Sequence, residues 1–356
     1  MSSILAYGLI LYCRPGFEKE CASETSALTT KAGLPGKVHA EPQSGVIRFV
    51  LNEPVDWRAI ADAIPFNDWV FARQRVVWVG RVEDLPTRDR VTPIASIVHD
   101  VGIHCGRVWM ETADTNDAKK VSGMLKRMTP HLEFALGNQN SLKNQDSLAT
   151  LHLFFEGQDR VDLGLTMLND ASPWPMGIAR LRMPRAAPSR STLKLAEAFQ
   201  ALMTEDERTA SLKAGLRAVD LGAAPGGWSL QFAERGLHVS AVDNGNIAPA
   251  VMATGMVEHV RADGFTWRPQ RKSEWMVCDM VEQPTRIAAL VADWIASGRC
   301  RRSIFNLKLP MKKRIEELAK CRKLIDQRMR QLPGAYTLRF KHLYHDREEI
   351  TGYLAK

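Results

Sequence analysis

Four apolar segments in the second half of the chain each end in a residue able to bind a ligand or carry a proton. Short apolar runs of this kind predict buried strands. Ligands of parallel α/β sheets bind at the carboxyl ends of the strands, and a charge buried there costs free energy unless it is paired or used. We therefore predict a ligand site at this edge, although each aspartate alone is also typical of a turn or a helix cap. The segments are 218–221, 239–242, 275–278 and 303–307, and their polar residues are Asp220, Asp243, Asp279 and Lys308.

The first of these strands runs into a glycine-rich turn, DLGAAPGG at 220–227. Its glycines allow a sharp turn and a close approach of backbone to ligand. The turn is not GxGxxG and no GK[ST] follows, so pyrophosphate and nucleoside triphosphate sites are disfavoured. Asp243 stands about 20 residues downstream, where a carboxylate can bind ribose hydroxyls. Asp263, after a further strand at 258–261, could accept a hydrogen bond from an adenine amino group.

The elements that must position these residues divide into two patterns. Strand–helix alternation over residues 218–354 predicts an α/β, Rossmann-like, doubly wound sheet, and we assign 190–356 to this domain. The N-terminal half mixes strands and helices less regularly, which predicts an α+β subdomain over 1–85 and a second small α+β domain over 86–170. The Pro- and Gly-rich stretch 171–189 is the predicted linker. Expected N-terminal strands are 4–13, 46–51, 70–79, 107–112, 149–155 and 160–165.

Length and composition exclude several classes of protein. The chain has 356 residues, which suggests at least two domains. The sequence has no run of about 18 apolar residues, so no membrane-spanning helix is predicted. The first residues lack the charged-then-apolar pattern of a secretory signal. Six cysteines without a CxxC pair predict neither a disulfide scaffold nor a zinc site. We expect a cytoplasmic protein with no metal and no membrane partner.

The charge is unevenly distributed. Residues 1–175 carry a net charge of −3 and residues 176–356 carry +11. Two groups of cations stand before and after the Lys308 segment, and we expect them to hold phosphates around a bound polyanion. The alternative is that each group is only a solvated surface. The groups are Arg299, Arg301 and Arg302 before the segment, and Lys312, Lys313 and Arg314 after it.

The motifs DLGAAPGGWS, VDNG, ADGF, CDM and NLKLP, preceded by SRSTLKL, resemble those of the FtsJ-type class I ribose 2'-O-methyltransferases. The further segments CRPGFEKEC, EWMVCDMVE and LYHDREE are similar to a bacterial 23S rRNA branch of this family, over essentially the whole chain. The resemblance implies S-adenosylmethionine as methyl donor and a cytidine in the peptidyl-transferase region of 23S rRNA as substrate. It also implies a ferredoxin-like piece and a THUMP RNA-binding domain in the N-terminal half.

The resemblance also implies the site residues. The family's Lys-Asp-Lys-Glu tetrad falls on Lys194, Asp279, Lys308 and Glu349, with Glu348 as the alternative for the last position. The glycine turn departs from the close relatives in having Ala224 where cysteine is expected, which a backbone-lined turn should tolerate. The implied cofactor contacts are Ser191, Ala224, Pro225, Gly226, Gly227, Asp243, Asp263 and Asp279.

Ribose methylation needs a base, because a ribose hydroxyl must lose its proton to attack the sulfonium methyl group. Lys308 is the natural base, but only as a neutral amine, and the sulfonium and Lys194 both disfavour a second positive charge beside them. The carboxylates Asp279 and Glu349 then orient the two lysines.

Two rival functions stay open at this stage. Methylation of a base is disfavoured, because no Pro-Pro-aromatic turn follows Asp279 and no Pro-Cys occurs, while Cys278 is predicted to be a buried core thiol. A non-catalytic rRNA-binding assembly factor would not require the tetrad. The spacing does not separate tRNA from rRNA. We expect a monomer acting on 23S rRNA that is protein-free or incompletely assembled.

Overall fold

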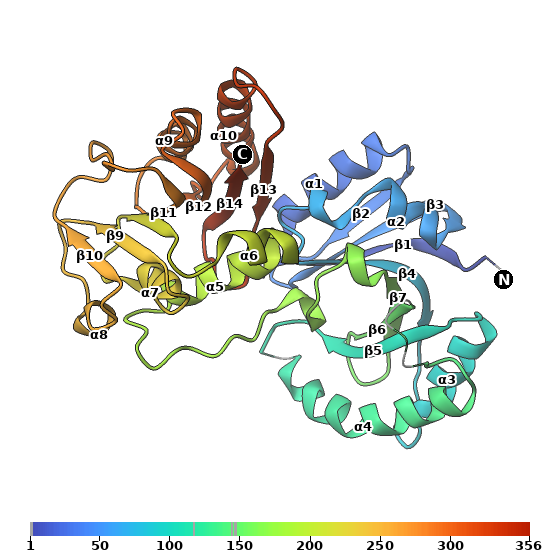
Figure 1. Cartoon of the computed structure of the whole chain (residues 1–356). Helices are drawn as coiled ribbons and strands as arrows, with labels where there is room; N and C mark the ends of the chain where they lie inside the picture. Colours follow the sequence, from blue (N-terminus) through green and yellow to red (C-terminus); the bar gives the residue numbers. More distant parts are fainter. Residues whose placement is uncertain (1–2, 117, 144, 146–147) are drawn as a thin grey trace. The chain divides into compact units, whose positions relative to one another are not determined.

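The computed structural model describes residues 3–356 apart from 117, 144 and 146–147. The chain forms two compact units, Met1–Ile178 and Ala179–Lys356 (Figure 1). The boundary between them falls inside the stretch 171–189. No helix of the described residues is long and apolar enough to cross a membrane.

The first unit is built on one seven-stranded sheet with the order β2-β3-β1-β4-β7-β6-β5. All neighbouring pairs are antiparallel except β5 and β6. Because β4 pairs with β7, the sheet continues across residue 85, and the predicted division of this unit at that residue stays a prediction. The strands are β1 (Leu5–Tyr12), β2 (Gly36–Ala40), β3 (Val46–Asp56), β4 (Gln74–Val82), β5 (Cys105–Thr112), β6 (Ala149–Phe155) and β7 (Val161–Thr166).

Four helices pack on this sheet. Helix α1 contacts β2 and β3, α2 contacts β3 and β4, and α3 and α4 pack on each other, with α4 also on β5. Asp56 begins α2, because its side chain accepts a hydrogen bond from the Arg58 N–H at 2.8 Å. The helices are α1 (Glu18–Lys31), α2 (Trp57–Ala63), α3 (Val91–Asp100) and α4 (Lys119–Asn138).

The second unit is built on a seven-stranded sheet with the order β10-β9-β8-β11-β12-β14-β13. The strands from β10 to β12 are parallel, and β14 is antiparallel to both of its neighbours. This is the predicted doubly wound mixed sheet. The strands are β8 (Arg217–Leu221), β9 (His238–Val242), β10 (Val257–Val260), β11 (Ser273–Cys278), β12 (Cys300–Lys308), β13 (Thr337–Lys341) and β14 (Glu349–Ala355).

Helices lie on both faces of this second sheet. α9 contacts β11, β12 and α10, while α5 and α7 pack on each other and against strands β8, β9, β13 and β14 (Figure 1). The helices are α5 (Ser191–Leu202), α6 (Glu205–Ser211), α7 (Gly227–Ala233), α8 (Pro249–Met252), α9 (Pro284–Ala296) and α10 (Arg314–Met329).

A buried aromatic cluster fixes α5 on the sheet. Phe199 of α5 packs edge-on against Phe232 of α7 and Trp275 of β11, with ring centroids 5.5 and 5.8 Å apart. Trp275 also contacts Tyr353 of β14 at 6.3 Å. All four rings are almost fully buried. Since Phe199 follows Lys194 by five residues and Trp275 precedes Asp279 by four, this packing sets the positions of both polar residues.

The elements differ from expectation in several places. The fourth strand begins at Gln74 rather than at residue 70. β2 was not predicted, because its side chains are mostly exposed and show no apolar alternation. Helix α6 was also missed, although Thr204 and Glu207 form a capping box at its start.

Candidate active site

The predicted polar residues meet at the carboxyl edge of the second sheet. Cys278 pairs in register with Leu221 on one side and Phe305 on the other, so β8 and β11 end level with each other and β12 continues three residues further, to Lys308. Asp279 follows β11 directly, and Lys308 is the last residue of β12. Asp243 follows β9 on the far side of β8. The predicted residues therefore lie at one edge of the sheet, and a ligand site there stays a prediction.

The glycine turn between β8 and α7 lies against this edge. Gly222 and Gly226 adopt left-handed φ angles of 76° and 105°. A Cβ on Gly222 would stand 2.4 Å from Met280 Cγ, so only glycine fits. The Asp243 carboxylate accepts from the Ala224 N–H at 3.0 Å and from the Gly245 N–H at 2.7 Å. Asp243 thus holds the turn against the end of β9.

Two hydroxyls beside the turn are left for a ligand. Ser189 Oγ and Thr192 Oγ1 are buried and have no hydrogen-bond partner among the described residues. A Cβ on Gly227 would lie 2.8 Å from Thr192 Oγ1 and 3.1 Å from Ser189 Oγ, so both hydroxyls face the start of α7. Buried polar atoms without partners are costly, so their presence here fits a polar ligand seated on the turn. Sequence reasoning missed both residues, although they flank the predicted Ser191.

Asp263, the other predicted cofactor contact, lies in the exposed turn after β10. Its carboxylate accepts from the Phe265 N–H at 2.9 Å. The turn is also held from the first turn of α9, because the Arg286 guanidinium stacks over the Phe265 ring at 4.4 Å. The carboxylate keeps acceptor positions for a ligand.

The four tetrad residues form one connected group. Lys308 Nζ donates to Asp279 Oδ1 at 2.7 Å. Lys194 of α5 binds Glu349 Oε1 and lies 3.8 Å from Asp279 Oδ2. Glu349 is the first residue of β14 and stands opposite Lys308 in the antiparallel register. The structure therefore brings together two lysines and two carboxylates from α5, β11, β12 and β14.

Helix α5 delivers its polar residues on one face. Ser191, Lys194 and Glu197 follow each other at intervals of three, which places them on the same side of a helix. Ser191 Oγ donates to Asp279 Oδ2 at 2.7 Å. The Glu197 carboxylate accepts from the backbone N–H groups of Tyr344 and His345, which holds the loop before β14.

Burial and neighbouring charges shift the pKa values of Asp279 and Lys194 in opposite directions. Burial raises the pKa of Asp279, but the charges of Lys308 and Lys194 and the hydrogen bonds from Lys308 and Ser191 outweigh it, so its pKa lies below the ordinary value. Burial likewise lowers the pKa of Lys194, and Asp279 and Glu349 outweigh it, so its pKa lies above the ordinary value. Asp279 is therefore an ionised carboxylate and Lys194 an ammonium ion at neutral pH.

The two adjacent glutamates have different partners. The Glu349 side chain is 10% exposed and binds Lys194. The Glu348 side chain is 55% exposed, and it binds Arg314 at 2.5 Å instead. The Glu348 N–H donates to Glu349 Oε2 at 3.1 Å. Of the two, only Glu349 contacts the other tetrad residues.

Asp220, near the same edge of the sheet, has a raised pKa, in contrast to Asp279. Asp220 of β8 is fully buried, and its Oδ2 accepts from Ser229 Oγ at 2.7 Å. Burial raises the pKa of Asp220 to about 7; the Ser229 hydrogen bond lowers it, and the Asp279 charge raises it further. Asp220 therefore changes its charge near neutral pH.

One of the two predicted cation groups is misplaced. Arg299, Arg301 and Arg302 lie at the amino end of β12, whereas Lys308 ends that strand. A strand rises roughly 3.3 Å per residue, so about 20 Å separates Arg302 from Lys308 along it. Arg302 also pairs with Glu274. The prediction that these arginines flank Lys308 is therefore wrong, because proximity in sequence along a strand is not proximity at its end.

The second cation group does follow Lys308 at the same edge. Lys312 and Lys313 are exposed, and Arg314 begins α10 and pairs with Glu348. Two exposed apolar side chains also follow the strand ends: Val281 comes two residues after Asp279 and Met311 three residues after Lys308, at 87% and 82% exposure. The edge thus carries cations and accessible apolar groups side by side with the tetrad.

The cysteines of the described residues are core residues. Cys278 is fully buried, and burial raises the pKa of its thiol to about 12, as expected for a core cysteine. All six cysteines are free and buried. Among the residues that the structure describes, no group of three or more His, Cys, Asp or Glu is placed to hold a metal ion.

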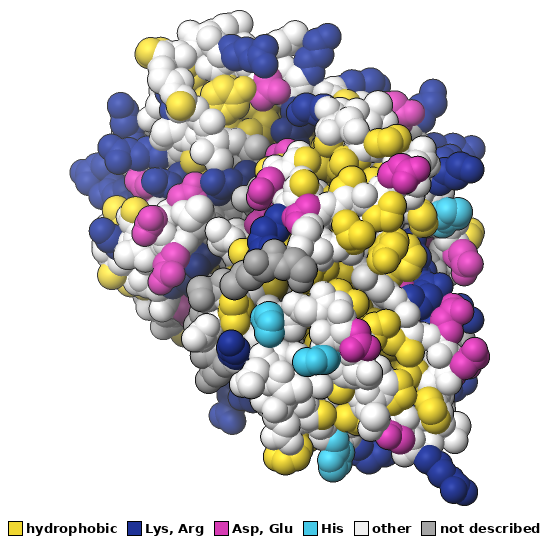
Figure 2. Space-filling model, turned by 90° about the vertical axis from the view of Figure 1, so that its right-hand side faces the viewer, with side chains coloured by type: hydrophobic (Ala, Val, Ile, Leu, Met, Phe, Trp, Pro, Cys, Tyr) yellow, Lys and Arg dark blue, Asp and Glu magenta, His cyan; other side chains and the backbone are white. Residues whose placement is uncertain are grey.

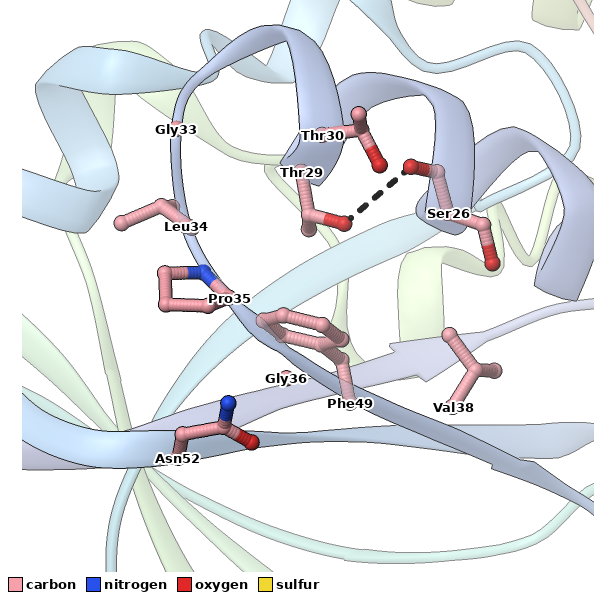
Figure 3. Close-up of a pocket in the computed structure, with 10 residues that line it drawn as sticks. All are labelled: Ser26, Thr29, Thr30, Gly33, Leu34, Pro35, Gly36, Val38, Phe49 and Asn52. Atoms are coloured by element: carbon pink, nitrogen blue, oxygen red, sulfur yellow. Dashed lines mark hydrogen bonds between the residues drawn. The ribbon is translucent and has the colours of Figure 1, made fainter.

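The first unit presents a different kind of surface. Figure 2 shows hydrophobic side chains gathered over the middle of one face, with acidic, basic and histidine side chains around them. A pocket of about 650 Å³ lies between the end of α1 and strands β2 and β3, with Phe49, Asn52 and the hydroxyls of Ser26 and Thr30 around it (Figure 3). No titratable side chain lines this pocket. It therefore offers hydrogen bonds and apolar contact but no acid–base chemistry.

Comparison with known proteins gives a consistent result for every part of the chain. Residues 6–76 match the RlmM ferredoxin-like domain, 89–167 the N-terminal domain of ribosomal RNA large subunit methyltransferase M, and 187–311 the FtsJ-like methyltransferase. Proteins named ribosomal RNA large subunit methyltransferase M match almost end to end. That of Aromatoleum aromaticum is 57% identical over 99% of this chain and 96% of its own length. Those of Azoarcus sp. and Methylococcus capsulatus are 52% and 47% identical over 99% and 97% of this chain, and over 97% of their own lengths.

Proposed function

Because this chain belongs to the family of ribosomal RNA large subunit methyltransferase M, we propose that it methylates the ribose 2'-hydroxyl of a cytidine in 23S rRNA. The methyl donor of this FtsJ-like methyltransferase is S-adenosylmethionine. The observation that carries the proposal is the tetrad, in which Lys308 stands at the carboxyl edge of the sheet with Asp279, Lys194 and Glu349 around it. A lysine base matches a poorly acidic hydroxyl, and no nucleophilic cysteine is accessible beside it.

The residues around the glycine turn fit the methyl donor. Asp243 at the end of β9 is placed to accept hydrogen bonds from ribose hydroxyls, and Ser189 and Thr192 offer buried hydroxyls at the turn. When bound, S-adenosylmethionine supplies an electrophilic methyl group on a sulfonium. The turn itself presents backbone without side-chain obstruction at Gly226 and Gly227.

Lys308 takes the proton of the 2'-hydroxyl in this proposal. Asp279 fixes the position of its Nζ at 2.7 Å, and Ser191 and Asn306 in turn fix Asp279. The base must be a neutral amine when it accepts the proton. Glu349 holds Lys194 in place. The chain's own contribution is therefore to position the hydroxyl, orient the base and receive one proton.

The RNA side of the site is the rim formed by Val281, Met311, Lys312 and Lys313. A 2'-hydroxyl can reach Lys308 only if its nucleotide is turned out of a stacked helix, which exposes the apolar faces of its base. Apolar side chains inserted beside bases support such distortion, and lysines hold the adjoining phosphates. We assign the first unit to RNA shape recognition, with the THUMP domain over 86–170 and the ferredoxin-like part over 1–85.

The proposed substrate is 23S rRNA before subunit assembly is complete, in the cytoplasm. A nucleotide of the peptidyl-transferase region would be buried in the finished subunit. Methyl transfer should therefore be faster on protein-free rRNA than on assembled large subunits. Equal rates on the two substrates would contradict this part of the proposal.

The chemistry is tested by where the methyl group goes. The protein is incubated with S-adenosylmethionine labelled in the methyl group and with unmodified 23S rRNA, and the product is digested with alkali. A 2'-O-methyl group blocks cleavage of the neighbouring phosphodiester, so we expect label in a resistant dinucleotide. Label in mononucleotides alone would mean methylation of a base, and no label in RNA would favour a binding factor.

A further inference from the structure

A buried carboxyl group outside the tetrad is connected to it by side chains alone. Asp346 lies in the loop between β13 and β14 and is fully buried. Thr351 Oγ1 stands 2.9 and 3.1 Å from its two carboxyl oxygens and 2.8 Å from Asn306 Oδ1. Asn306 Nδ2 donates to Asp279 Oδ1 at 2.9 Å. Asn306 and Thr351 are also fully buried, so the connection excludes water from Asp346 as far as Asn306.

The direction of the hydrogen bonds follows from Asp279. An ionised carboxylate only accepts, so the amide NH2 of Asn306 must face it and the amide oxygen must face Thr351. The amide oxygen has no proton, so the single hydroxyl proton of Thr351 is donated to Asn306. Thr351 then presents only oxygen lone pairs to Asp346.

An ionised Asp346 would place a lone pair against a lone pair at this contact. A proton on Asp346 Oδ1 supplies the missing donor: Oδ1 then donates to Thr351 Oγ1 over 3.1 Å, while Oδ2, which lies 2.9 Å from the same hydroxyl, accepts from the Leu343 N–H at 3.0 Å. We propose that Asp346 is protonated in the working protein and acts as a positioning residue, orienting Asp279 through Thr351 and Asn306. The inference rests on the proposed function only for what Asp279 then does to Lys308.

The surroundings of Asp346 agree with a neutral carboxyl group. Burial raises its pKa, and the charges of Glu349 and Glu197 raise it further, to well above the ordinary value. Two lysines belong to the surrounding elements: Lys194 of α5 is bound to Glu349, and Lys341, the last residue of β13, is 7% exposed and stands opposite Thr351 in the register. From the loop itself, His342 Nε2 bonds the Arg347 carbonyl oxygen at 3.0 Å.

The positioning role proposed for Asp346 depends on the pairing of β12 with β14. Asn306 and Thr351 are directly opposite in the register of β12 and β14, and Lys308 and Glu349 are the next pair on the same face. The chain of hydrogen bonds therefore lies immediately behind the tetrad. It turns the Asn306 amide so that Asp279 Oδ1 is held between this amide and Lys308, and it accounts for the aspartate in the LYHDREE segment.

Replacing Asp346 by asparagine is the direct test, because asparagine keeps one donor for Thr351 and one acceptor for Leu343. We expect Asp346→Asn to transfer methyl groups within about threefold of the wild type, while Asp346→Ala loses about tenfold or more in kcat. Affinity for S-adenosylmethionine should be the same in both. If Asp346→Asn loses as much as Asp346→Ala while staying folded, the charged carboxylate is required and the proposal is wrong.

A second pair of variants tests the middle of the connection. Thr351→Val keeps the shape and removes the hydroxyl, and we expect kcat to fall about tenfold with KM for RNA unchanged. Thr351→Ser restores the hydroxyl and should restore kcat. Equal activity of the valine and serine variants would contradict the connection.

Infrared difference spectroscopy separates this inference from the proposed function, because it needs no substrate. At about pH 8, the difference between wild type and Asp346→Asn should contain the carbonyl band of a protonated carboxyl group. A carboxylate band in its place would overturn the inference even if methyl transfer proceeds as proposed. The protonated band together with a wild type that methylates no RNA would leave this inference standing and sink the proposed function.

Discussion

Replacing Glu349 by glutamine, with Glu348→Gln as its control, tests the part of the tetrad that the sequence left open. The two residues are adjacent and chemically identical, yet only Glu349 contacts Lys194. Glutamine keeps the size and one acceptor oxygen of glutamate and removes the charge. The variant therefore asks what the charge contributes to holding Lys194 beside Asp279.

The magnitude follows from the contacts. The Lys194 and Glu349 side chains are 15% and 10% exposed, so their attraction is only partly screened. Two unit charges about 4 Å apart attract by about 4 kcal/mol at an effective dielectric constant of 20. Asp279 at 3.8 Å and the glutamine oxygen retain part of this attraction. We expect a loss of about 2–3 kcal/mol in transition-state stabilisation, which is roughly 30- to 150-fold in rate.

The control should behave differently, because Glu348 is 55% exposed and pairs with Arg314 at the surface. Exposed ion pairs contribute about 0–1 kcal/mol, so Glu348→Gln should change the rate by less than about fivefold. The assay is single-turnover methyl transfer from labelled S-adenosylmethionine to unmodified 23S rRNA, with thermal unfolding measured for each variant. A Glu349→Gln rate within fivefold of the wild type, or an equal loss in the control, would refute this reasoning.

Three further predictions follow from the same edge of the sheet. Asp243→Ala should weaken S-adenosylmethionine binding about 10- to 100-fold by calorimetry, and an unchanged Kd would contradict its role. The double variant Val281→Ala and Met311→Ala should raise KM for RNA about tenfold with cofactor affinity unchanged, whereas Met252→Ala, also an exposed methionine of this unit, should not. Since burial raises the pKa of Asp220 to about 7, the folded state binds the extra proton and stability falls as pH rises from about 4 to about 7. Asp220→Asn should therefore raise the unfolding free energy at about pH 8, by up to about 4 kcal/mol, and not at about pH 4; an equal shift at both would contradict this.

The sequence predicted the position of the tetrad better than its surroundings. Asp279 and Lys308 were predictable because each ends an apolar strand, and parallel strands end at one edge. The strand over 149–155 was also placed correctly, as all seven residues of β6 are buried. In contrast, β2 is an exposed edge strand, and its sequence carries no apolar alternation by which to recognise it.

The residues that the sequence did not reveal depend on pairing between distant segments. Asn306 and Thr351 are 45 positions apart and meet only because β14 inserts beside β12 in antiparallel register. An asparagine two residues before Lys308 is nevertheless a signal, since asparagine is unfavourable inside strands and shares the face of Lys308. The prediction that the Arg299 group flanks Lys308 was wrong for the opposite reason. These residues are close to Lys308 in sequence, but the length of β12 separates them from it.

The central claim is that Lys308 removes the proton of a ribose hydroxyl, and Lys308→Ala tests it most directly. Single-turnover transfer to unmodified 23S rRNA is measured at saturating S-adenosylmethionine, with cofactor and RNA binding measured separately on the same variant. General base catalysis contributes about 10²- to 10⁴-fold, so we expect a loss of that size in the alkali-resistant dinucleotide with both affinities retained. A Lys308→Ala protein that forms this product within tenfold of the wild-type rate would contradict the account.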